Sequence, residues 1–314
     1  MRRLRPLPKS LRSRARRCSA GSQRSSVRAL GSRRGSLCHD QRMTQQRRII
    51  VANWKANLPP GEEVALAGEI ATGLAAQLAT TAPHVIEVLL APSHVGLVAV
   101  TSLLRREHPA IGIGTAAQDA SATEVGAHTG ESPATHLVGI ADAVIVGHSE
   151  RRRERGESDA IVGAKLARIV AAGLRPILCL GDDLIDGGER ERAAALSNQW
   201  IAALAGAAGL GVDRTALLAA GLVVAYEPVW AIGSGRPATP AIASAAAAAI
   251  RASVGSDLPI LYGGSVDADG AAAFLASRHD DGGRIDGLLV GGASLSASRF
   301  LGIIVATRSA ASGR

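Results

Sequence analysis

Short apolar runs rich in β-branched residues alternate along this chain with longer alanine-rich runs. We interpret eight of the short runs as strands, at 48–52, 86–91, 111–116, 143–146, 176–180, 222–226, 259–262 and 287–290. Alanine favours helix, and the longer runs predict helices between the strands, at 62–79, 159–172, 189–206 and 240–254 among others. This alternation is typical of the α/β class.

Eight strands separated by helices over about 260 residues match a single-domain (β/α)8 barrel. A doubly wound open sheet has the same alternation, and the number of strands does not separate the two. Polar residues follow the carboxyl ends of the strands, and in a barrel all of these ends meet on one face. We therefore predict a barrel over 43–306, followed by a short polar tail at 307–314.

Charge is distributed unevenly along the chain. The formal net charge is +8, but residues 1–42 carry 13 Lys and Arg and a single acid, whereas residues 43–314 carry 22 basic and 26 acidic side chains. The predicted barrel is therefore mildly acidic and lacks the basic surface that nucleic acid requires. No apolar run has the length of a membrane span, so we expect neither nucleic acid nor membrane as a partner.

The basic segment at 1–42 is rich in Arg, Ser and Gly and has no apolar periodicity, which predicts disorder. Three explanations compete: a transit peptide, a segment that binds RNA or acidic lipid, and a translation start that lies at Met43 instead. The three cysteines (Cys18, Cys38 and Cys179) form neither a disulfide framework nor a metal-binding spacing. We expect a reducing, cytoplasmic location.

The stretch VANWKAN places Asn53 and Lys55 at the end of the first strand. A strand has a period of two, so both side chains project from the same face. The chain has only three lysines, Lys9, Lys55 and Lys165, among 35 basic side chains. A lysine kept in such an arginine-rich sequence indicates a need for a compact ammonium group.

The stretch VIVGHSERR places His148 between a strand and a short helix that begins near Ser149. The partial positive charge of a helix N-terminus disfavours protonation of the imidazole, and a neutral imidazole can donate a hydrogen bond to a carbonyl group. A histidine with only a structural role is the alternative.

The stretch YEPVWAIGSG combines a carboxylate at a strand end, Glu227, with a loop of apolar and small residues that includes Trp230 and Gly233. Glycines let such a loop move. If the apolar side chains close over Glu227, the carboxylate loses water and becomes a stronger base. We interpret the stretch as a base and its lid. The alternative is an ordinary loop with a surface Glu.

Glycines end the last two strands, in YGGSV and VGGASL. Backbone N–H groups near Ser265, Gly291 and Gly292 can surround an anion, and a following helical turn favours phosphate. A phosphate site after the seventh and eighth strands is common in barrels.

Taken together, these stretches closely resemble the triosephosphate isomerase family from about residue 47 to residue 306. The resemblance implies that Glu227 moves a proton between neighbouring carbons and that Asn53 and Lys55 hold the substrate. It also implies that a neutral His148 polarises the substrate carbonyl and moves protons between the two oxygens of an enediol(ate) intermediate. Gly233, Ser265, Gly291 and Gly292 would bind its phosphate, and Ser149, Glu150, Asp182 and Trp230 would support the site. The reaction requires no metal and no cofactor, and its place is glycolysis and gluconeogenesis.

The family is usually dimeric, so the resemblance also implies a homodimer. Thr129, in the motif GAHTGE, would reach Asn53 and Glu150 of a second copy, with Gln118 and Arg151 in the same region. Several positions depart from the family pattern. Asp119 stands for an Asn, Asp182 for a Glu expected to meet Trp230, Arg155 for an aromatic residue, and Arg236-Pro237-Ala238 for the usual lid hinge. Proline fixes φ and stiffens that hinge.

The leading function is therefore the interconversion of D-glyceraldehyde 3-phosphate and dihydroxyacetone phosphate. Two alternatives remain at this stage. One is the same chemistry on a four-carbon ketose phosphate (a tetrulose phosphate), which the altered lid would allow. The other is a non-catalytic sugar-phosphate-binding protein. This alternative is disfavoured because the chain has all four polar residues implied for catalysis, Asn53, Lys55, His148 and Glu227.

Overall fold

A computed structural model describes residues 48–78, 86–234 and 236–312 of the chain. The basic segment 1–42 and its predicted disorder, Met43 and Gly235 of the lid lie outside these ranges. Within them, no helix is both long and apolar enough to span a bilayer.

The strands form a closed parallel barrel in the order β1 to β8, with β1 paired to both β2 and β8. This confirms the predicted (β/α)8 barrel over the open sheet. The strands are β1 (Arg48–Asn53), β2 (Ile86–Ala91), β3 (Gly114–Ala117), β4 (Ala143–Val146), β5 (Arg175–Asp182), β6 (Val223–Pro228), β7 (Ile260–Tyr262) and β8 (Gly287–Val290).

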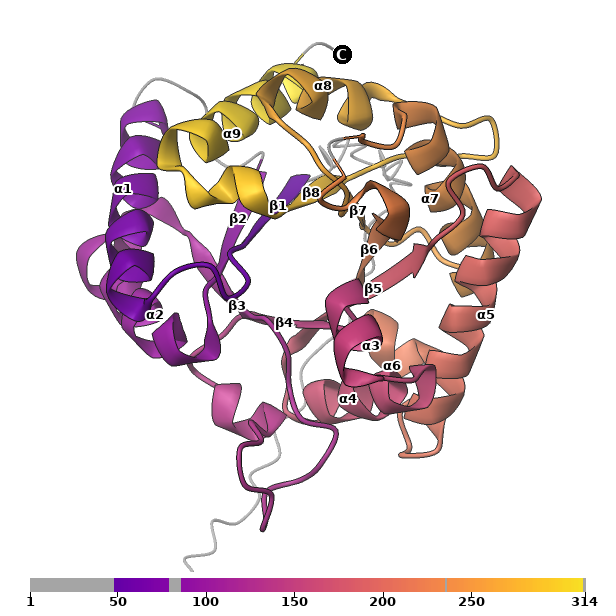
Figure 1. The fold of residues 1–314 in the computed structure, drawn as a ribbon. Coiled ribbons are helices and arrows are strands. Elements are labelled where there is room, and N and C mark those ends of the chain that lie inside the picture. Colours follow the sequence, from indigo (N-terminus) through magenta and orange to yellow (C-terminus); the bar gives the residue numbers. More distant parts are fainter. Residues whose placement is uncertain (1–47, 79–85, 235, 313–314) are drawn as a thin grey trace, which may run out of the picture. The chain divides into compact units, whose positions relative to one another are not determined.

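Helices surround the barrel in a ring (Figure 1). They are α1 (Pro60–Leu78), α2 (His94–Glu107), α3 (Ser149–Arg155), α4 (Asp159–Ala171), α5 (Glu189–Ala208), α6 (Arg214–Ala219), α7 (Pro240–Val254), α8 (Ala268–Ala276) and α9 (Ala297–Ser312). Short 3-10 turns are η1 (Pro109–Ile111), η2 (Ala134–Leu137), η3 (Val229–Ala231) and η4 (Gly292–Leu295). A long loop between β3 and η2 projects away from the ring (Figure 1).

The strands are buried on both faces, which explains why they read as continuous apolar runs. In β1, Ile49 and Val51 belong to a cluster of small and branched side chains that fills the barrel interior. Ile50 and Ala52, on the opposite face, join the larger core between the sheet and the helices. The period of two thus divides each strand between two cores.

Two of the predictions, for the start of the third strand and for the C-terminal tail, differ from the structure by more than two residues. The third strand was expected from residue 111, but Ile111 closes the 3-10 turn that begins at Pro109, and Gly112 then takes a left-handed φ of 69°. Proline favours the first position of such a turn, so the strand begins only at Gly114. The polar tail expected at 307–314 instead continues α9 as far as Ser312, with Thr307 buried and its hydroxyl bonded to the Ile303 carbonyl.

Candidate active site

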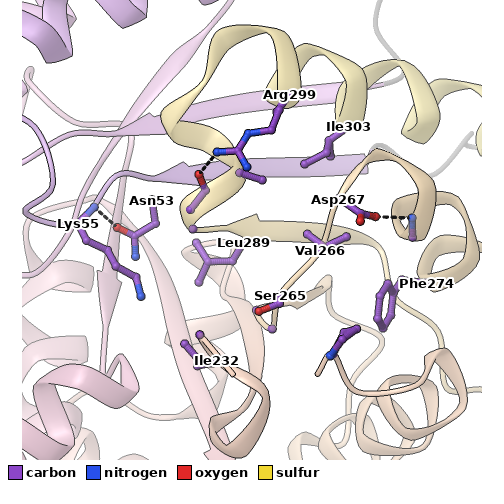
Figure 2. A pocket seen from close by; sticks show the side chains of 18 of the residues that line it. Asn53, Lys55, Ile232, Ser265, Val266, Asp267, Phe274, Leu289, Arg299 and Ile303 are labelled. Atoms are coloured by element: carbon purple, nitrogen blue, oxygen red, sulfur yellow. Dashed lines mark hydrogen bonds between the residues drawn. The ribbon is translucent and has the colours of Figure 1, made fainter. Parts of the chain in front are cut away.

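A cavity of about 840 Å³ opens at the carboxyl ends of the strands. Its lining comes from β1, from α3, from the segment after β6, and from the loops after β7 and β8. Figure 2 labels Asn53, Ile232, Ser265 and Leu289 among the lining residues. Asn53, Lys55, His148, Gly233, Ser265, Gly291 and Gly292, all expected from the sequence, lie on its wall. The barrel therefore brings together groups from the first strand to the last, because parallel strands end on one face.

Lys55 is held in an unusual backbone conformation directly after β1. Its φ is 53°, the one positive value among the non-glycine residues that the structure describes. The Asn53 side-chain oxygen accepts a hydrogen bond from the Lys55 N–H at 3.1 Å, and the Gln118 side chain donates to the Lys55 carbonyl at 2.8 Å. The Lys55 ammonium lies 2.6 Å from the Glu150 carboxylate. Local strain, braced in this way, commonly marks a functional position.

His148 begins helix α3 as its N-cap. Its Nδ1 accepts a hydrogen bond from the Glu150 N–H at 3.2 Å. An imidazole that accepts at Nδ1 carries its proton on Nε2 when neutral. Nε2 lies 2.9 Å from Oε1 of Glu227, on the buried side of the ring.

Glu227 is the penultimate residue of β6 and is 1% exposed. Its Oε2 accepts a hydrogen bond from the Ser149 N–H at 2.8 Å, whereas Oε1 has no aligned donor. Glu227 itself does not line the cavity, although its neighbours His148 and Ser149 do. The carboxylate therefore rests just behind the cavity wall, between the Ser149 N–H and the His148 ring.

The pKa of His148 is shifted in the direction opposite to the one expected from the sequence, because of its contact with Glu227. Burial acts to lower the pKa of His148, but the Glu227 carboxylate outweighs it, and the net shift is upward. Burial likewise acts to raise the pKa of Glu227, but His148 and the Ser149 N–H lower it below its usual value. The helix N-terminus was expected to keep His148 neutral. The charge nearest to the imidazole is instead the carboxylate of Glu227, which is distant from His148 in sequence.

The glycine-rich loops after β7 and β8 are the segments in which we predict an anion site. Gly291 leads into η4, which begins at Gly292, so unbonded N–H groups point away from a short helical turn. Ser265 donates from its hydroxyl to the Ala231 carbonyl at 3.2 Å and so ties this region to the base of the lid. Gly233 has a φ of 69°, which a β-carbon would strain.

Asp182 does not contact the lid in the way that the resemblance implied. It accepts hydrogen bonds from the Tyr226 hydroxyl at 2.9 Å and from Arg192 at 3.1 Å, and it is 4% exposed. The Trp230 indole N–H is buried and has no hydrogen-bond partner within the described ranges. In this conformation Asp182 therefore supports β6, and Trp230 is held by packing alone.

Arg151, whose side chain is partly exposed, contacts a network of buried charges behind helix α3. The Lys165 ammonium lies 2.7 Å from Asp119 and 2.6 Å from Glu157, and Arg151 contacts the same two carboxylates. Burial is the main cause of the raised pKa of Asp119. The network joins the loop after β3 to α3 and α4, and so fixes the helix that presents His148.

Sequence reasoning missed the role of Lys165. The rarity of lysine, which pointed to Lys55, applied equally to Lys165 and could have singled it out. Gln118 was grouped with the dimer loop, and its side chain in fact braces Lys55 and β2 within one chain. Thr129 lies exposed in the projecting loop.

The described residues contain no group of three or more His, Cys, Asp or Glu side chains placed to hold a metal ion. The cavity wall carries an imidazole, an ammonium and backbone N–H groups, and the Glu227 carboxylate lies directly behind it. The fold and the site together define a (β/α)8-barrel enzyme with acid–base groups at the carboxyl ends of its strands.

Comparison with known proteins agrees with this class. The sequence profile of the triosephosphate isomerase family matches residues 48–307. The chain is 41% identical over 264 residues to a triosephosphate isomerase of Treponema pallidum, covering 81% of this chain and 97% of that protein. It is 39% identical to triosephosphate isomerases of Xanthomonas euvesicatoria and Leifsonia xyli, covering 82% of this chain and 97% and 95% of those proteins. The chain therefore belongs to the triosephosphate isomerase family.

Proposed function

We propose that this enzyme interconverts D-glyceraldehyde 3-phosphate and dihydroxyacetone phosphate. One observation carries the proposal: the buried Glu227 carboxylate and the His148 imidazole lie 2.9 Å apart beside a cavity that also holds Lys55. A buried carboxylate next to a neutral imidazole can move protons on carbon and on oxygen in one site. The family membership and the glycine loops at the other end of the cavity support a phosphorylated substrate.

In the proposed reaction, Glu227 removes a proton from the carbon beside the carbonyl. The electron pair of that C–H bond forms the C=C bond of an enediol(ate), and the carbonyl oxygen takes up the negative charge. His148 donates its Nε2 proton to that oxygen and accepts the proton of the neighbouring hydroxyl. Glu227 then returns its proton to the adjacent carbon, so that no atom is gained or lost.

Glu227 must turn toward the substrate for this step, because at rest it lies behind the cavity wall. Turning separates it from the Ser149 N–H, which lowers the pKa of the resting carboxyl. The loss of that bond makes Glu227 a stronger base. The same movement takes the negative charge away from His148, and burial and the helix N-terminus then favour the neutral imidazole.

Lys55 and Asn53 would hold the substrate and stabilise the charge on oxygen. Gly233, Ser265, Gly291 and Gly292 would supply N–H groups to the phosphate. Closure of the segment that carries Trp230 would exclude water and limit loss of phosphate from the enediol(ate).

A homodimer completes this proposal. Several exposed valines support it: Val95 and Val98 on the first turns of α2, Val125 in the projecting loop and Val138 after η2 are 53–79% exposed. The His94 ring lies 2.9 Å from the Asp119 carbonyl and so places α2 beside that loop. A second pocket, of about 430 Å³, has Lys55, Gln118 and Arg151 in its wall and would receive Thr129 of a second copy. We also expect the enzyme to act in the cytoplasm, in glycolysis and gluconeogenesis.

The test is steady-state turnover of the purified full chain on D-glyceraldehyde 3-phosphate, with a tetrulose phosphate assayed in parallel. We expect triose turnover to exceed tetrulose turnover, and Glu227→Gln to abolish both. Faster turnover of the tetrulose phosphate would contradict the triose assignment. Binding without turnover of either substrate would contradict catalysis altogether.

A further inference from the structure

The cavity continues beyond the glycine loops, between helices α8 and α9. Val266, Phe274, Gly302 and Ile303 line this extension. Arg299, on the first turn of α9, stands at its edge and donates from Nη2 to the Gly292 carbonyl at 3.2 Å (Figure 2). That bond places a guanidinium directly beside the backbone that is proposed to bind phosphate.

Arg299 differs from the other cations that line the cavity. The Lys55 ammonium is 2.6 Å from Glu150, and the Arg153 guanidinium is 3.0 Å from Glu154. Within the described ranges, no carboxylate lies within 4.0 Å of the Arg299 guanidinium, and its hydrogen bond is to a neutral carbonyl. Among the described residues, no carboxylate is therefore close enough to form an ion pair with Arg299.

Acidic side chains also line the extension, but on its other side. Asp267 and Asp269 lie at the start of α8, and the Asp267 carboxylate accepts a hydrogen bond from the Gly270 N–H at 2.8 Å. Asp267 is the N-cap of α8, so its charge is partly balanced by that helix N-terminus. Figure 2 shows Asp267 and Arg299 on different elements.

We propose that Arg299 is an affinity determinant for the phosphate dianion that the glycine loops receive. The inference rests on the proposed function, because the dianion is the phosphate group of the proposed substrate. Neutral N–H groups bind a dianion without balancing its charge, and Arg299 is the cation beside them that has no carboxylate partner among the described residues. Its bond to Gly292 also orders the long side chain before the ligand arrives, which reduces the entropy cost of binding.

Arg299 stands beside the phosphate end of the cavity and away from the reacting carbons. Its charge stabilises the bound substrate and the transition state equally. Loss of such uniform binding raises KM and leaves kcat nearly unchanged. The effect is also screened by salt, because the side chain is exposed.

The test is calorimetric titration of inorganic phosphate into the full chain at low ionic strength. Four proteins are compared: the natural sequence, Arg299→Gln, Arg299→Lys and Arg106→Gln. Arg106 is the charge-matched control, since it lies in the last turn of α2, pairs with Glu107 and has a side chain 72% exposed. For Arg299→Gln we expect the phosphate Kd to rise about fivefold or more, with Arg299→Lys in between and Arg106→Gln unchanged.

Kinetics provide a second readout: Arg299→Gln should raise KM by a similar factor with kcat within about twofold. An unchanged phosphate Kd in Arg299→Gln would overturn the proposal. An equal rise of the phosphate Kd in Arg106→Gln would also overturn it, because the effect would then come from net charge alone. A loss of kcat without a change of KM in Arg299→Gln would overturn it as well, because it would indicate a structural role. Phosphate binding is measured without turnover, so an inactive natural enzyme would refute the proposed function and leave the test of Arg299 intact.

Discussion

His148 and Glu227 lie on different strand ends of the barrel, with Nε2 and Oε1 2.9 Å apart, and each shifts the pKa of the other. The carboxylate is 1% exposed, so its charge is met by His148 and by the Ser149 N–H rather than by water. This resting contact has consequences for titration and for turnover that can be measured separately.

The first prediction concerns the reach of the base. Glu227→Asp shortens the side chain by one methylene and moves the carboxylate by about 1 Å, which can cost about 100-fold or more in rate. We expect kcat to fall by about 10²–10³ with the fold preserved, measured by steady-state kinetics and circular dichroism. A rate equal to that of the natural enzyme would remove Glu227 as the base.

The second prediction concerns the titration of His148. Its pKa is raised by the Glu227 charge against the effect of burial. In Glu227→Gln the charge is gone and burial remains, so the pKa of His148 should fall below its usual value. The measurement is a pH titration of the imidazole by NMR in both proteins.

The same shift makes stability depend on pH. Because the folded-state pKa of His148 is raised, the stability that the contact contributes is fully present below the unfolded pKa, about 6.5. It is lost as pH rises through the folded pKa. The titration of His148 therefore contributes to the difference in unfolding free energy between the natural protein and Glu227→Gln. We expect this contribution to become smaller toward alkaline pH. A difference that widens there would contradict the assignment.

The third prediction concerns Lys55, whose ammonium lies 2.6 Å from Glu150 at the cavity wall. Lys55→Arg keeps the charge but introduces a larger planar group that the pocket does not match. We expect a severe loss of kcat/KM in steady-state assays, with little change in the thermal unfolding temperature. Near-normal activity would mean that Lys55 serves only as a counter-charge.

The fourth prediction concerns the network around Lys165. Lys165→Met leaves the Asp119 and Glu157 carboxylates buried with Arg151 as their remaining partner, and one oxygen of Glu157 already lacks a hydrogen bond. Removing one partner of a buried pair costs about 3–5 kcal/mol of unfolding free energy. Asp119→Asn in the same background removes one stranded charge and should restore part of that loss. Denaturant titrations of the four proteins of this cycle measure the coupling, and strict additivity would show that the charges act independently.

The fifth prediction concerns assembly. Val95→Asp together with Val98→Asp places charges on the exposed face of α2 that is proposed to meet a second copy. We expect sedimentation velocity to show a dimer for the natural protein and a monomer for the variant, with lower turnover because Thr129 no longer reaches a neighbouring site. A natural protein that sediments as a monomer at micromolar concentration would contradict the dimer.

Much of the fold could be predicted from local patterns. Branched apolar runs and alanine-rich runs predicted every strand except the third to within one or two residues at each end, and the longer helices nearly as well. The prediction for the third strand was wrong at its start because a proline-led turn at Pro109 contains an apolar residue, Ile111, that resembles strand. A polar tail was predicted from residue 307 because Thr307 is polar, whereas in the structure this residue is buried within α9.

The sequence by itself determined which chemical groups stand at the strand ends, because the spacing of apolar residues and the residues that end each strand are local properties of the chain. Tertiary structure alone decided which of those groups meet. It set Glu227 against His148 and reversed the expected shift of the imidazole pKa. In the tertiary structure, Asp182 accepts hydrogen bonds from Tyr226 and Arg192 and does not contact Trp230 as expected. The fold also brings Arg299 within hydrogen-bond distance of Gly292. Such pairings depend on closure of the barrel and on strand register. Both bring together residues that lie far apart along the chain, and no local sequence pattern indicates which of them will meet.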